Sequence, residues 1–97
     1  MTHSWIFLAT PPPLAETLIG NSAEFYVTHC IEKWTGSKMK GKYDPAAMSS
    51  WTTPFVRSPD VIKAACEDYR AGPTRDIEAE AADEKGLTVP TLVLYSR

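Results

Sequence analysis

The stretch CEDYRAG, residues 66–72, places two acids, a tyrosine and an arginine directly before a glycine. Acidic and basic side chains at this spacing form ion pairs on a helix, and a phenol O–H donates a hydrogen bond to an anion. Such a cluster is typical either of a solvated helix end or of one wall of a binding site. For Glu67, Asp68 and Arg70 the pattern favours a local ion-pair and hydrogen-bond set, with Arg70 suited to the helix dipole.

Tyr69 has two competing interpretations. It closes an apolar helical stripe with Ile62, Ala65 and Cys66, which favours packing in the core. Its phenol O–H would equally suit the lining of a pocket, where a polar tip faces a ligand. The residue type alone therefore leaves both interpretations open.

The sequence offers no group that completes a catalytic site around this stretch. Cys30 and Cys66 form neither a CxxC pair nor a zinc-binding spacing, and His29 has no metal-binding partner at ligand spacing. The pattern places no histidine beside a serine as a general base. We therefore expect no catalytic residue, no metal site and no cofactor in this chain. Two free thiols are favoured over a disulfide, which the sequence leaves open.

Composition indicates one small globular domain. The chain has 97 residues, of which 43% are hydrophobic and 23% charged, with a net charge of −2. Without a basic block, nucleic acid and anionic membrane are disfavoured as partners. The apolar run at residues 5–9 is too short for a signal segment or a membrane span, so we expect a cytoplasmic protein.

Prolines, glycines and capping residues divide most of the chain into helices. Residues 4–9 are typical of the tail of a helix, and Pro11, Pro12 and Pro13 end it. About five short helices then follow: 13–19, one that starts at an Asn21–Glu24 capping box and ends at Gly36, one from 45, 59–71 and 74–85. Pro54 predicts a break or kink in the third of these helices, and the Gly72–Pro73 pair predicts the end of the fourth.

The last apolar segment has a different pattern. The sequence TLVLY at 91–95 is partly β-branched and follows Pro90, which predicts a buried strand. A single strand cannot satisfy its own backbone hydrogen bonds, and the chain offers no second strand. Together with the helix already under way at residue 4, this predicts that both ends are cut edges of a larger structure.

The order of these motifs resembles a known domain. WIFLATPPPLAETLIG at 5–20, YDP at 43–45, CEDYRAG at 66–72 and a final strand are similar to the helical cap of α/β-hydrolases of the haloacetate (fluoroacetate) dehalogenase type. The resemblance extends over residues 4–95 and includes epoxide-hydrolase relatives. It implies a mainly α fold in which residues 1–97 form one cap-like helical domain. The strand at 91–95 would then be a remnant of the hydrolase core sheet.

The resemblance also implies a chemistry. In such enzymes an aspartate displaces the halide and a His–Asp pair activates the water that hydrolyses the ester. Those residues, and the arginines that bind the substrate carboxylate, would lie outside this chain. The cap contributes a halide cradle of a His–Trp pair and a tyrosine, which correspond to Ser4, Trp5 and Tyr69. Ser4 departs from the pattern, because it replaces the histidine with an uncharged donor. We expect Trp5 and Tyr69 to lie within side-chain reach of each other.

Two function classes follow from this comparison. In the first, the chain is a cap-domain fragment that lines a substrate and halide pocket, is inactive alone, and meets a small haloacid-type substrate only with a hydrolase core. In the second, it is a stand-alone interaction module from a truncated gene, whose expected partner is a second copy paired through residues 92–95. The sequence leaves open whether the chain is a natural product or a piece of a longer one.

Overall fold

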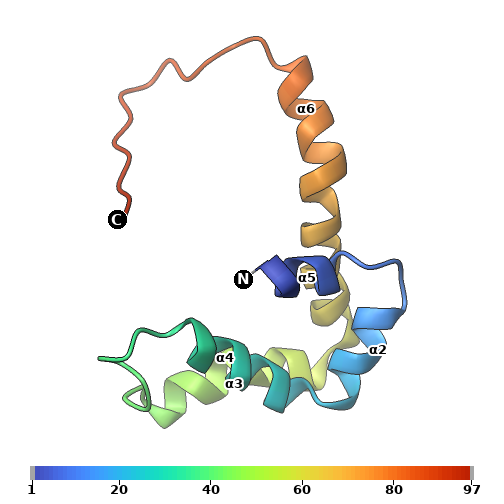
Figure 1. The fold of residues 1–97 in the computed structure, drawn as a ribbon, viewed down its shortest axis with the longest axis vertical. Coiled ribbons are helices and arrows are strands. Elements are labelled where there is room, and N and C mark those ends of the chain that lie inside the picture. The colour runs from blue at the N-terminus through green and yellow to red at the C-terminus, as the bar shows by residue number, and fades with distance from the viewer. Residues whose placement is uncertain (1, 97) are drawn as a thin grey trace.

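The structure is a computed structural model that describes residues 2–96, with side chains described from Trp5 onward. The described residues are mainly helical, as predicted (Figure 1). Their elements, in chain order, are α1 (Thr2–Leu8), α2 (Leu14–Asn21), α3 (Ala23–Trp34), α4 (Pro45–Arg57), α5 (Pro59–Ala71), the π-helical turn η1 (Gly72–Asp76) and α6 (Ile77–Ala82).

Proline marks the start of α4 and α5, as expected, and α4 also has a side-chain cap. The side chain of Asp44 accepts a hydrogen bond of 3.2 Å from the backbone N–H of Ala46, and Pro45 occupies the first helical position of α4. Pro59 begins α5 in the same way. The prolines at 11–13 separate α1 from α2, as predicted.

Of two predicted interruptions, the break at Pro54 is wrong and the end at Gly72 is found only in part. Pro54 lies inside α4, which continues to Arg57 because its packing against α3 outweighs the lost backbone hydrogen bond. The α-helical part of this segment, α5, ends at Ala71 with Gly72 as its C-cap, so the end predicted there is found in part. Gly72 nevertheless has helical backbone angles, and the chain continues as η1, whose wider hydrogen bonding accommodates Pro73, which has no N–H to donate. As a result, α5, η1 and α6 form one continuous rod (Figure 1).

The buried core is small. It consists of parts of α1, α2, α3 and α5, with half-buried aromatic side chains around it. The buried apolar residues are Leu8, Ala15, Ile19, Ala23, Ile62 and Cys66. Helices α1 and α2 pack on α5, while α3 and α4 pair with each other below them (Figure 1). Both cysteines are free, as favoured by the sequence, and Cys66 is fully buried.

The strand predicted at 91–95 does not form. These residues belong to an extended tail that leaves the end of α6 and runs apart from the helices (Figure 1). Leu92 and Leu94 are 82% and 84% exposed. The physical reason is that a strand needs a partner strand for its backbone hydrogen bonds, and residues 2–96 contain none.

The described helices leave the chain open rather than compact. Its radius of gyration is 16.6 Å, whereas a compact domain of this length has about 13 Å. Within the described part, no helix combines the length and the apolar character that crossing a membrane requires.

Candidate functional site

Helices α1 and α5 bring the two predicted site residues together. The rings of Trp5 and Tyr69 meet edge to face, with centroids 5.8 Å apart and an interplanar angle of 80°. This geometry is favourable for aromatic pairs. It confirms that the two side chains lie within reach of each other, and we call this pair the Trp5–Tyr69 wall.

A glycine lies beside this contact. A Cβ placed on Gly72 would lie 3.4 Å from Cζ2 of Trp5, which is an ordinary contact distance. Gly72 therefore lies directly against the indole, where α1 meets the rod. The last residue of CEDYRAG belongs to the same wall as Tyr69.

Arg70 reaches well beyond its own helix. Its Nε donates a 2.9 Å hydrogen bond to the backbone oxygen of Thr10, which follows α1. Its Nη1 donates at 2.6 Å to Glu16 on α2 and at 2.7 Å to Glu67 on α5. The local Glu67–Arg70 pair was expected, whereas the links to Thr10 and Glu16 were missed, because no short-range spacing signals a contact across more than fifty residues.

Ionisation in this region follows from these contacts. The hydrogen bond from Arg70 is the main cause that lowers the pKa of Glu16, and the same bond raises the pKa of Arg70. The neighbouring thiol of Cys66 has a pKa raised by burial. Among the described residues, Oε2 of Glu16 and Nη2 of Arg70 are buried without a hydrogen-bond partner. The pair thus holds opposite charges in a largely desolvated place between three segments.

Tyr69 also borders an apolar hollow of about 200 Å³. The hollow lies between α1, α2, α3, α4 and α5, and its lining includes Tyr26, Cys30, Trp34, Phe55, Ile62 and Tyr69. Burial is the main cause that raises the pKa of Tyr26, whose ring lies 6.1 Å from that of Phe7. Tyr69 therefore packs against the core, as the first interpretation expected, and its role in lining a ligand pocket stays a prediction.

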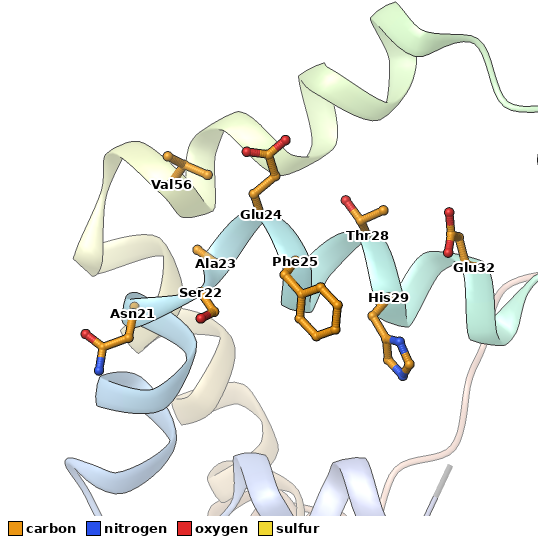
Figure 2. Close-up of a pocket in the computed structure, with 10 residues that line it drawn as sticks. Asn21, Ser22, Ala23, Glu24, Phe25, Thr28, His29, Glu32 and Val56 are labelled. Atoms are coloured by element: carbon orange, nitrogen blue, oxygen red, sulfur yellow. The ribbon is translucent and has the colours of Figure 1, made fainter.

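A larger, open hollow of about 670 Å³ lies elsewhere, along α3 and the end of α4. Figure 2 shows the rings of Phe25 and His29 on one side of α3, with Glu24 and Glu32 on another. The two rings stack with centroids 5.7 Å apart, and His29 is exposed. The spacing of four residues between Phe25 and His29 was the signal for this stack. None of the residues lining this hollow belongs to the Trp5–Tyr69 wall.

The remaining predictions have mixed outcomes. The backbone of Ser4 belongs to α1, but its side chain lies outside the described residues. The aromatic side chains of Trp34 and Trp51 are 51% and 44% exposed. Trp51 meets the edge of Tyr43, with ring centroids 5.5 Å apart. These tryptophans leave large apolar surface uncovered instead of filling the core.

No protein-family model matches the chain. The chain is 33% identical, over 90 residues, to a fluoroacetate dehalogenase from Burkholderia sp.. The aligned region covers 92% of this chain but only 29% of that relative, so the chain spans less than a third of its length. The resemblance noted in the sequence is thereby confirmed: the chain is homologous to one part of a fluoroacetate dehalogenase.

Proposed function

We propose that this chain is the cap segment of a haloacetate dehalogenase-like α/β-hydrolase and that it lines the substrate and halide pocket. In this proposal Trp5 and Tyr69, with Ser4, supply hydrogen-bond donors to the departing halide. The observation that carries the proposal is the 5.8 Å contact between Trp5 and Tyr69. Helices distant in sequence bring together the two donors that correspond to the halide cradle.

The chemistry of the wall supports this role. An indole N–H and a phenol O–H are neutral donors, and they suit an anion that forms as a carbon–halogen bond breaks. Such donors are worth more where water is excluded, because the local dielectric is low. Trp5 is 53% exposed in this chain, so a covering domain would have to supply that exclusion.

The extent of uncovered surface supports a missing core. The accessible surface is 8087 Å², whereas a compact monomer of this mass exposes about 5500 Å². Large apolar side chains contribute to the excess, including Trp34 on α3 and Leu14 and Leu18 on α2. A cap that rests on a hydrolase core would have this uncovered face.

The nucleophile and the water-activating pair are proposed to lie in that core. Within the described part of the chain, His29 lines the open hollow of Figure 2 and not the hollow beside Tyr69. Among the side chains described from Trp5 onward, the hydrogen bonds around the wall join no nucleophile to a base. The chain would therefore shape a pocket and hold a leaving group, while the bond-breaking groups come from elsewhere.

A chimera tests this function. The segment of the Burkholderia relative that aligns with this chain would be replaced by residues of this chain, and fluoride release from fluoroacetate would be measured with an ion-selective electrode. A folded chimera that releases fluoride in proportion to enzyme supports the cap role. A chimera that folds, as judged by circular dichroism, but releases no fluoride contradicts it.

The exposed tail favours a second candidate, self-association. Val93, Leu94 and Tyr95 are each more than 70% exposed, and an unpaired extended segment pairs with an available strand. A two-fold axis would join two tails into an antiparallel ribbon in a stand-alone homodimer. Light scattering on the purified chain distinguishes this dimer from a monomer.

A further inference from the structure

We infer that Arg70 is a positioning residue, held by Glu16, that fixes the end of α1 so that Trp5 stays against Tyr69. The inference rests on the proposed function only for its catalytic meaning. The contacts that carry it belong to this chain and do not depend on a hydrolase core.

The first step concerns α1 itself. It has seven residues, too few for a helix to be stable by its own hydrogen bonds. Its end is shaped by Thr10, whose side-chain hydroxyl donates to the backbone oxygen of Phe7 at 2.7 Å. Arg70 then donates to the backbone oxygen of Thr10 at 2.9 Å. The guanidinium therefore holds the turn that directly follows the helix carrying Trp5.

The second step concerns what holds Arg70. Its Nη1 contacts both Glu16 and Glu67, but the side chain of Glu16 is 18% exposed and that of Glu67 is 44% exposed. A half-exposed pair contributes little, whereas a mostly buried, charge-assisted bond constrains geometry. Glu16 belongs to α2, so it holds the guanidinium of Arg70 from outside α5. Of the two acids, Glu16 is therefore the one that sets the direction of the Arg70 guanidinium.

The third step links this anchor to the wall. Arg70 directly follows Tyr69 on α5, and Gly72, two residues on, lies against the indole of Trp5. The turn at residues 69–72, where α5 passes into η1, thus carries Tyr69, the glycine that lies against Trp5 and the side chain that holds the end of α1. Losing the guanidinium would leave the edge-to-face contact without its lateral support.

Other charges facing Glu16 bear on any test by pH. Lys63, Cys66 and Glu67 lie near it on α5 along with Arg70. Asp60, also on α5, lines with Glu16 a separate hollow of about 390 Å³. Arg70 has the strongest effect on the pKa of Glu16, which is lowered. Protonation of Glu16 removes the charge that Arg70 binds. The Trp5–Tyr69 contact should therefore weaken as the pH falls through the lowered pKa of this carboxyl.

Proton NMR on the chain alone tests the inference, with cross-peaks between the Trp5 and Tyr69 rings as the readout. The contact between Tyr43, which precedes α4, and Trp51 within α4 is the internal reference. The variants are Glu16→Gln and Arg70→Lys, and Glu67→Gln is the matched control. Glu16→Gln removes the charge that Arg70 binds. Arg70→Lys keeps the positive charge but cannot make the hydrogen bonds of Nε and Nη1 together. We therefore expect each variant to reduce the Trp5–Tyr69 cross-peaks more than about twofold.

In the same spectra the Tyr43–Trp51 cross-peaks and the Glu67→Gln control should stay unchanged. In the unmodified chain the Trp5–Tyr69 cross-peaks should weaken at acidic pH, and Glu16→Gln should abolish that dependence. Unchanged Trp5–Tyr69 cross-peaks in both variants would overturn the inference. Equal loss of both aromatic contacts would also overturn it, because Glu16 would then support the fold as a whole. Failure of the chimera would leave this result intact, so the two proposals fail separately.

Discussion

At the scale of single residues, the stretch CEDYRAG divides into different tasks. Cys66 is fully buried in the core, Tyr69 meets Trp5, and Gly72 lies against the indole. Arg70 connects three segments through Thr10, Glu16 and Glu67. The stretch is thus neither only a solvated helix end nor only a pocket wall.

The Glu16–Arg70 link predicts a pH-dependent stability. Because the folded-state pKa of Glu16 is lowered, its stabilisation is fully present above the ordinary value of 4.5 and is lost as the pH falls through the lower folded value. At pH 7, Glu16→Gln should lower the melting temperature by roughly 5 °C. Thermal unfolding followed by circular dichroism between pH 3 and pH 7 measures both proteins. If the difference in melting temperature between the two proteins stayed constant from pH 3 to pH 7, it would contradict this role of the Glu16 carboxylate.

At the scale of elements, capping chemistry predicted where most helices begin. Asp44–Pro45 and Ser58–Pro59 mark the starts of α4 and α5, because local residues decide these starts. Pro54 did not act as a stop and Gly72 ended only the α-helical part of its segment, since packing along α3 and a π-helical turn overrode the local preference. For the tail at 91–95 the local preference for a strand was not enough, because a strand depends on a partner that residues 2–96 do not provide.

Only part of the candidate site could be predicted from the sequence. Trp5 and Tyr69 were found through their resemblance to a family pattern, which records a tertiary contact that composition does not. The reach of Arg70 to Thr10 and Glu16 was not found, because it depends on how α1 and α2 fold onto α5. Contacts between distant segments are set by packing, and one sequence contains no direct record of them.

Pro54 provides a prediction for α4. A proline inside a helix removes one backbone hydrogen bond and strains the preceding turn, so Pro54→Ala should stabilise the chain by about 1–3 kcal/mol. Pro45→Ala is the matched control, because a proline at the first helical position costs little. Urea unfolding of the two variants measures the difference. A Pro54→Ala variant no more stable than Pro45→Ala would show that α4 has adapted to its proline.

At the scale of the whole molecule, the chain is extended and incompletely covered. Its radius of gyration of 16.6 Å and its large accessible surface are what a segment built to rest on another domain would have. The relative is more than three times longer than the aligned region, which leaves ample chain for a core. We expect this exposed surface to favour association of the isolated chain.

The isolated chain should release no halide. Without an aspartate nucleophile and an activating histidine, the ester can neither form nor break, and such losses cost orders of magnitude in rate. Incubation with fluoroacetate or chloroacetate, followed by an ion-selective electrode, should match the buffer blank. Halide release that scales with protein and survives repurification would refute this expectation.

The isolated chain should also self-associate. Its exposed apolar residues include Trp34, Leu92 and Leu94, and burying them against a second copy is favourable. Multi-angle light scattering at tens of micromolar should give a dimer or larger species, and Leu94→Lys should shift it toward the monomer. Lys85→Glu, in the same tail, tests whether a change of charge alone has this effect. A folded monomer of the unmodified chain would exclude the dimer.

The central claim is that the Trp5–Tyr69 wall faces the leaving halide, and turnover by the chimera tests it most directly. In that background Trp5→Phe and Tyr69→Phe each remove one donor and leave an aromatic side chain in place. The account predicts that each lowers kcat for fluoroacetate on the order of a hundredfold, while Trp51→Phe, which alters the aromatic pair far from the wall, changes it little. Equal kcat values in all three variants would contradict the account, because the wall would then play no part in halide release.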